Sequence, residues 1–117
     1  MALIISPKIR QKLAKKHGVS KEEVIQCFAN WDTSLYAPMI DDREEHATDP
    51  PTRWFVAETD MGRMLKVLFV WYEEDGRIYL KSAYEASKAV QAMFFGDNQA
   101  ASPQKGVMRN EQTNQGD

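Results

Sequence analysis

The chain has 117 residues, of which 43% are hydrophobic and 27% charged, and its formal net charge is −2, which is typical of one globular domain able to bury its own core. Its single cysteine, Cys27, excludes a disulfide framework and a thiolate metal site. No apolar run approaches the roughly 20 residues that cross a membrane, and no cleavable signal pattern is present, so we expect a cytosolic protein.

The first predicted element is a basic helix over residues 7–17. Ser6 suits the N-cap, and Pro7 suits the first helical position, where the missing N–H of proline costs nothing. Residues 1–21 carry six lysines and arginines and no acidic side chain, so a polyanion is the first partner to consider. The acidic net charge of the whole chain counts against a strong nucleic-acid binder.

A second helix is expected over residues 21–29, after a tight turn. Gly18 can take the left-handed conformation that ends a helix. Ser20 and Glu23 match a capping box, in which each side chain bonds to the backbone N–H of the other residue. Three apolar side chains of this helix are expected to face the core: Val24, Ile25 and Phe28.

Residues 31–52 are predicted to be irregular and polar, with a short strand at 35–40. Within residues 41–49, five acidic side chains stand against Arg43 alone. These carboxylates and His46 could bind a divalent metal. The segment lacks the glycine and the spacing of a calcium loop, so we favour a solvated acidic loop and expect no metal.

Three strands follow, at 53–59, 63–72 and 77–83, and their turns predict an antiparallel meander. The middle segment is nearly continuously apolar, as in a central strand that is buried on both faces. Asp75-Gly76 is a hairpin signal. The last segment alternates, which places Lys81 on its polar side.

Ser82 and Glu85 fit a second capping box, which predicts a third helix from there to Phe95. The chain beyond Gly96 is polar and nearly free of large apolar groups, so residues 97–117 are expected to form a disordered tail. The sequence therefore predicts one α+β domain over residues 1–96.

Several local motifs share their order and spacing with a known family. They are Lys16 to Ser20 followed by Glu22-Glu23, Asp42-Arg43-Glu44, Arg53-Trp54, Gly62 to Leu65, and Lys81 to Ala83. On these residues the chain, over roughly 6–95, resembles the BrnT-type toxins of the RelE/ParE superfamily, which are small ribonucleases of bacterial or phage-borne toxin–antitoxin modules.

The resemblance implies a RelE/ParE-like α+β fold with two N-terminal helices, an antiparallel meander of three to four strands and a C-terminal helix. It also implies RNA as substrate, cleavage without a metal or cofactor, and a cognate antitoxin bound over the basic surface. The oligomeric state stays open.

RNA cleavage without a metal needs a base for the 2′-OH proton, cations beside the phosphate, and an acid for the leaving 5′-oxygen. His17 is the residue whose ordinary pKa lies near neutrality. We take His17, Arg63 and Lys81 as the candidate catalytic residues. The candidate substrate-binding residues are Lys16, Lys12, Arg53, Lys66 and Tyr84.

Each of these residues has a plainer interpretation. His17 could cap a helix C-terminus, and Arg63 could be a charge beside a turn. Lys81 could be a solvated lysine on an exposed sheet face. Lys66 interrupts an apolar strand, and a salt bridge to Glu58 or snorkelling at the sheet margin would account for it.

Two other functions stay open. The stretch directly after Ala83 is Tyr84-Glu85-Ala86 and has no arginine, whereas BrnT-like toxins usually carry an arginine-rich stretch there. This favours a non-catalytic BrnT-like binding or regulatory module. The chain also resembles small bacterial proteins catalogued as ADP-ribosyl-(dinitrogen reductase) hydrolases. We rank that activity last, because such hydrolases are large helical proteins that hold two magnesium ions.

Overall fold

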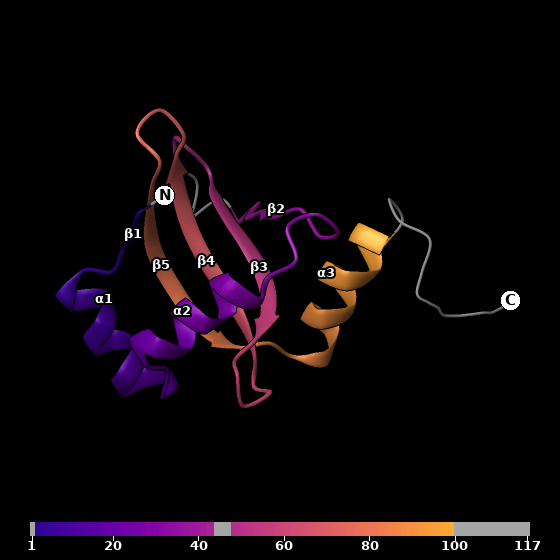
Figure 1. The fold of residues 1–117 in the computed structure, drawn as a ribbon, viewed down its shortest axis with the longest axis horizontal. Coiled ribbons are helices and arrows are strands. Elements are labelled where there is room, and N and C mark those ends of the chain that lie inside the picture. Colours follow the sequence, from indigo (N-terminus) through magenta and orange to yellow (C-terminus); the bar gives the residue numbers. More distant parts are fainter. Residues whose placement is uncertain (1, 44–47, 100–117) are drawn as a thin grey trace, which may run out of the picture.

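The described strands form one curled sheet with helices on both sides of it (Figure 1). The computed structural model describes residues 2–43 and 48–99. Its sheet has five strands in the order β1-β5-β4-β3-β2. These are β1 (Ala2–Ile4), β2 (Met39–Ile40), β3 (Thr52–Glu58), β4 (Met64–Tyr72) and β5 (Arg77–Glu85). The helices are α1 (Pro7–Lys12), its π-helical continuation η1 (Leu13–His17), α2 (Lys21–Asn30) and α3 (Lys88–Gln99).

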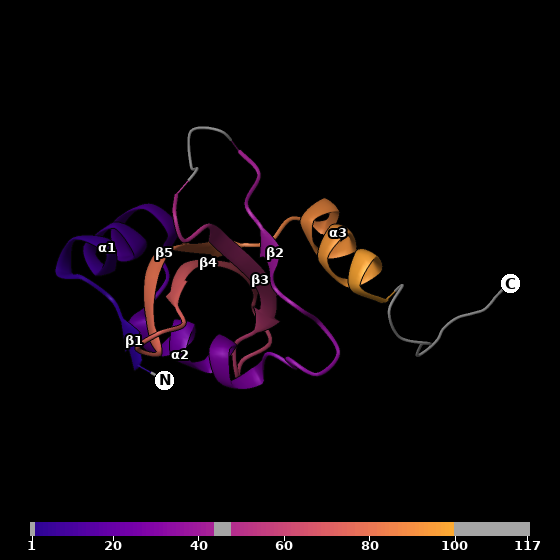
Figure 2. The same cartoon turned by 90° about the horizontal axis from the view of Figure 1, so that it is seen from above.

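The helices divide the sheet into two differently used faces. Figure 2 shows α2 across the open side of the curled sheet, with α1 and α3 at opposite flanks. On the inner face, buried side chains of the sheet such as Phe55 and Val67 belong to one core with Val24 and Cys27 of α2. The outer face carries Trp54, whose ring lies 5.8 Å from that of Phe94 in α3.

The predicted meander and both N-terminal helices are confirmed. Strands β3, β4 and β5 are antiparallel neighbours with β4 between the other two. Ser6 caps α1, and Ser20 and Glu23 form both bonds of the predicted capping box. The first helix ends in a π-helical turn, at a left-handed Gly18.

The predicted start of the third helix is wrong. Residues 82–85 continue β5, where Ala83 pairs with Val67 and is fully buried. The helix begins at Lys88, after Ser87, whose hydroxyl accepts a hydrogen bond from the Val90 N–H at 3.1 Å. Strand pairing overrides the capping-box pattern because Ala83, the apolar residue within the pattern, is buried in the core. Helix α3 reaches Gln99, past the predicted boundary at 96, and residues 100–117 lie outside the described part.

Three smaller expectations also change. The parallel pairing of β1 with β5 was not predicted, because three residues carry no readable periodicity. The strand expected at 35–40 is only Met39–Ile40. Ile25, which was expected to face the core, is 45% exposed, whereas Cys27 of the same helix is fully buried. Burial raises the pKa of the Cys27 thiol to about 12, so it is an inert core group.

Two glycines offer a matched test of the helix ends. A methyl group would meet no atom within 4 Å at Gly18 or at Gly96, so only the backbone conformation differs. Because Gly18 has φ +60°, we expect Gly18→Ala to lower the free energy of unfolding by about 1 kcal/mol. Gly96→Ala, inside α3, should raise it by roughly 0.5–1 kcal/mol. Urea unfolding measures both, and equal effects would contradict the analysis.

Candidate functional site

A basic pocket of about 400 Å³ contains most of the predicted site residues. It is formed by η1, the C-terminal half of β5 and the segment between β2 and β3. Its lining consists of Lys12, Lys16, His17, Arg43, Thr48, Thr52, Leu68, Lys81, Ser82 and Tyr84. Positions far apart in the sequence thus bring four lysine and arginine side chains and a histidine to one place.

The surroundings of His17 favour the neutral form of its imidazole. Its ring lies 5.3 Å from the Tyr84 ring, between centroids. The pKa of His17 lies below 6.5, because burial disfavours the imidazolium and because Lys12 and Lys16 repel its charge. At neutral pH the ring is therefore uncharged, which is the state that a general base requires.

Lys81 reaches the pocket from an irregularity in the sheet. Phe69 pairs with Leu80, while its neighbour Leu68 pairs with Ser82. Lys81 is therefore the extra residue of a β-bulge, a feature that redirects side chains. It also lines a shallower groove along α1, together with Lys8, Lys12, Lys15 and Lys16, so the positive surface extends beyond the pocket.

Arg43, Thr48 and Thr52 line the pocket but were not predicted as site residues. The Arg43 guanidinium donates to both carboxylate oxygens of Asp41, at 3.0 and 2.9 Å. Thr48 donates its hydroxyl proton to the Pro50 carbonyl at 2.7 Å, so Thr52 must donate in the 3.1 Å contact between the two hydroxyls. The threonines thus face the pocket as hydrogen-bond acceptors.

The supposed acidic loop therefore contributes a cation to the pocket. Asp41 is 8% exposed, and residues 44–47 lie outside the described part. Hydrogen bonding to Asp41 raises the pKa of Arg43, to which the Tyr84 hydroxyl adds a smaller contribution. The sequence signal that could have identified Arg43 was its position two residues after Asp41. The other acidic residues around this pair made the segment resemble a solvated acidic loop instead.

Lys66 lies beside the pocket rather than in it. Its Nζ is 4.5 Å from the Trp54 ring centroid and 5.9 Å from that of Tyr84. The salt bridge to Glu58 is not present among the described contacts, so that explanation is wrong. Two aromatic rings hold the ammonium instead. The pKa of Lys66 is lowered, first by burial and then by repulsion from Arg43.

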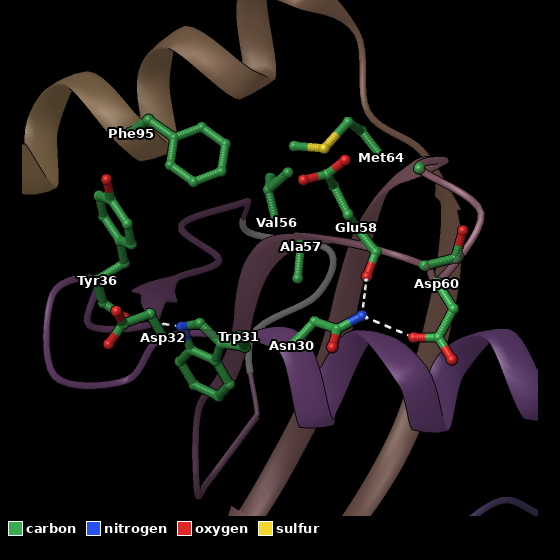
Figure 3. Close-up of a pocket in the computed structure, with 12 residues that line it drawn as sticks. Asn30, Trp31, Asp32, Tyr36, Val56, Ala57, Glu58, Asp60, Met64 and Phe95 are labelled. Atoms are coloured by element: carbon green, nitrogen blue, oxygen red, sulfur yellow. Dashed lines mark hydrogen bonds between the residues drawn. The ribbon is translucent and has the colours of Figure 1, made fainter.

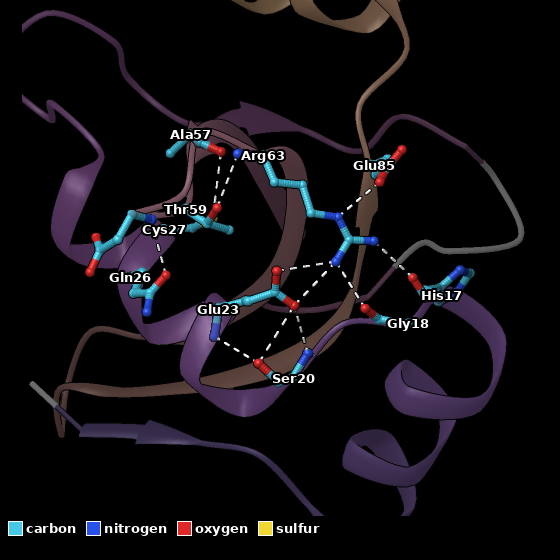
Figure 4. A network of polar contacts seen from close by, with 11 residues as sticks. His17, Gly18, Ser20, Glu23, Gln26, Cys27, Ala57, Thr59, Arg63 and Glu85 are labelled. Atoms are coloured by element: carbon cyan, nitrogen blue, oxygen red, sulfur yellow. Dashed lines mark hydrogen bonds and ion pairs between the residues drawn. The ribbon is translucent and has the colours of Figure 1, made fainter.

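Arg63 is not brought into the pocket, but lies behind η1 (Figure 4). Its guanidinium donates to the carbonyl oxygens of Gly18 at 2.8 Å and His17 at 3.1 Å. It also forms ion pairs with Glu23 at 3.1 Å and Glu85 at 2.8 Å. All of these partners are protein groups, so Arg63 fixes the backbone that carries His17.

Glu23 links this arginine to the capping box. Burial by itself would raise its pKa, but hydrogen bonds from the Ser20 backbone and from Arg63 outweigh burial and hold the pKa below 4.5. The carboxylate is therefore ionised at neutral pH and contributes to stability there.

Arg53 is separate from the other predicted residues. Its guanidinium lies 5.7 Å from the Trp71 ring centroid. It lines a different hollow, with Tyr72 and Asp75.

A second pocket, of about 530 Å³, has the opposite character (Figure 3). Figure 3 shows Tyr36, Trp31 and Phe95 around it, with Glu58 and Asp60 on the other side. No lysine, arginine or histidine is among its described lining residues. An anionic substrate would be repelled there, so the basic pocket is the better candidate site despite its smaller volume.

The described residues contain no group of three His, Cys, Asp or Glu side chains able to hold a metal, and His46 lies outside them. No helix in residues 2–43 or 48–99 has the length and apolar character needed to cross a membrane.

No family model matches the chain, and no curated protein does. Among solved structures, the chain is similar to the 1.1 Å crystal structure of the Brucella abortus ribonuclease toxin BrnT. The TM-score is 0.47 and the sequence identity 17%, over 75% of this chain and 99% of that one. No site residue is transferred from this likeness.

The electrostatic cause of the low His17 pKa can be tested directly. We expect Lys12→Met with Lys16→Met to raise the pKa of His17 toward 6.5, because two repelling charges are removed. Titration of the imidazole resonances by NMR measures it. Lys8→Met is the matched control, because Lys8 does not line the pocket. An unchanged pKa in the double variant would mean that burial alone lowers it.

The contacts of Arg63 with the helix-end carbonyls and with Glu23 predict that its substitution destabilises the protein. Arg63→Met should lower the free energy of unfolding by about 2 kcal/mol, because two helix-end carbonyls and a capping carboxylate lose a charged donor. Arg77→Met removes an exposed arginine that is paired only with Asp75 among the described contacts, and should change stability little.

The Arg63 effect should also depend on pH. Because the pKa of folded Glu23 is lowered, its contribution is complete above pH 4.5 and is lost as the pH falls through the folded pKa. The stability difference between wild type and Arg63→Met should therefore shrink in acid, as measured by urea unfolding at several pH values. A difference independent of pH would contradict the role of the Glu23 pair.

Proposed function

We propose that the chain is a toxin-like endoribonuclease that cleaves RNA without a metal. The observation that carries this proposal is that His17 lines one pocket with Lys12, Lys16, Arg43 and Lys81. A neutral base surrounded by fixed cations suits proton removal next to a phosphate diester. The sequence motifs that resemble BrnT toxins support the same class of function.

In the proposed reaction His17 takes the proton from a ribose 2′-OH. The 2′-oxygen then forms a bond to the adjacent phosphorus, and the bond from phosphorus to the 5′-oxygen breaks. Lys81 and Lys16 stabilise the negative charge that grows on the phosphate oxygens. Tyr84 donates its phenolic proton to the leaving 5′-oxygen. The products are a 2′,3′-cyclic phosphate and a 5′-hydroxyl, and the proton on His17 later returns to Tyr84 through water.

The other predicted residues take supporting roles in this proposal. Lys12 and Lys66 add positive potential around His17 and Tyr84. Arg63 acts as a positioning residue for His17 rather than as a phosphate contact, because its donors are engaged by the protein. Arg53 lies in another hollow and is not part of the proposed site.

The proposed setting is the cytoplasm of a bacterial or phage-infected cell, where RNA is the substrate. Following the resemblance, a cognate antitoxin would cover the basic face formed by α1, η1 and Lys81. Such a partner would need an acidic surface to match the lysines of that face.

A non-catalytic binding or regulatory module is the alternative. It is favoured by one observation, namely that Arg43 is the single arginine among the pocket's described lining residues and is paired with Asp41. The catalogued ADP-ribosyl hydrolase activity has no support of this kind in the described residues, and we do not propose it.

Regulated expression in a bacterial host tests the function. Wild type should arrest growth and fragment bulk RNA, whereas His17→Ala should do neither because the base is missing. Cleavage by the purified protein should persist in excess EDTA. Normal growth and intact RNA, with folded wild-type protein present at a high level, would contradict the ribonuclease proposal and favour the non-catalytic binding module.

A pair of tyrosine variants tests the proposed acid. Tyr84→Phe should lower kcat by about 100-fold with little change in KM, because the proton donor is lost while the ring stays. Tyr72→Phe is the control, since Tyr72 lies at the far end of β4 and faces Tyr79. Steady-state cleavage of a short oligoribonucleotide measures both, and equal kcat values would remove Tyr84 from the reaction.

A further inference from the structure

Arg43 is held in a defined position at the edge of the basic pocket. Its Nε and Nη2 donate to the two carboxylate oxygens of Asp41, and its backbone N–H donates to Asp41 Oδ1 at 3.2 Å. The Asp41 side chain is 4% exposed, while that of Arg43 is 42% exposed. A buried carboxylate thus anchors one edge of the guanidinium and leaves the other edge open.

The open edge still has donors. A guanidinium carries five N–H groups, and Asp41 takes one from Nε and one from Nη2. Three remain, on Nη1 and Nη2, and no hydrogen bond from them to another residue of the described part is present. The Tyr84 hydroxyl interacts with the guanidinium electrostatically. N–H groups of Arg43 are therefore available to a ligand in the pocket.

The other groups that line the pocket select the kind of ligand. Lys12, Lys16 and Lys81 are cationic, and the hydroxyl protons of both threonines are already donated to protein oxygens. The available donors therefore belong mainly to the guanidinium and the ammonium groups. Such a set matches the oxygens of a phosphate, and a planar guanidinium can bind two of them at once.

We propose that Arg43, braced by Asp41, is a phosphate-binding residue of this pocket. It supplies a guanidinium that the stretch Tyr84-Glu85-Ala86 lacks, and it does so from the segment between β2 and β3. This inference rests on the proposed function in one respect only, namely that the bound phosphate belongs to the RNA that is cleaved. Binding of a nucleotide phosphate can be measured without any cleavage.

The test is an NMR titration with uridine 3′-monophosphate, following the His17 imidazole resonances. Arg43→Lys should raise the Kd about tenfold, because the charge stays while bidentate binding is lost. Arg43→Met should raise it further. Arg77→Met is the matched control, because it removes the same charge at a distant, exposed hairpin and should leave the Kd near that of wild type.

The variant Asp41→Asn distinguishes positioning of the Arg43 guanidinium by Asp41 from a simple effect of charge. Removing a carboxylate makes the pocket more positive, so charge alone predicts tighter binding. If the brace matters, the loosened guanidinium should bind more weakly. A Kd that falls or stays the same in Asp41→Asn would overturn the bracing role. A Kd for Arg43→Met equal to that of Arg77→Met would overturn the whole proposal and leave Arg43 as a structural ion pair.

Failure of the Arg43 inference can be distinguished from failure of the proposed function. If wild type binds the nucleotide through Arg43 but cleaves no RNA, the phosphate site stands and the ribonuclease proposal falls. If wild type cleaves RNA and Arg43→Met cleaves it with unchanged KM, the ribonuclease proposal stands and Arg43 has no part in binding. Folding of each variant is checked by circular dichroism.

Discussion

The guanidinium of Arg63 is the contact on which the arrangement of the basic site depends. It joins the last carbonyls of η1, the capping carboxylate Glu23 and the end of β5 through Glu85. Helix α1 has six residues and η1 five, which is too short for stability without tertiary contacts. The position of His17 is therefore set from the sheet, by an arginine 46 residues further along the chain.

Much of the fold could be predicted from local patterns, and the failures have physical causes. The capping box at Ser20 is local and was correct, whereas the same pattern at Ser82 was overruled by the pairing of Ala83 with Val67 in the sheet. For the site, the basic character of the N-terminal segment pointed to Lys12, Lys16 and His17, and the structure places these three in one pocket. The partners of Arg63 and the place of Arg43 could not be predicted, because each depends on contacts between distant segments or on a brace within an acidic stretch.

The net charge of −2 conceals a separation of charge across the molecule. The basic pocket has no carboxylate in its described lining, and the pocket of Figure 3 has no cation in its own. A phosphate is therefore attracted to one region and repelled from another. An acidic net charge is therefore compatible with the anionic ligand proposed for the basic pocket.

The π-helical turn has a geometric consequence for the pocket. In an α-helix each residue advances by about 100°, so residues five apart point roughly 140° away from each other. A turn closed by i→i+5 bonds is wider, so residues five apart point in more similar directions than they do in an α-helix. Lys12 and His17 are five apart and line the same pocket. The wider turn thus lets two residues that are five apart line one pocket, a spacing that a regular α-helix would place on different faces.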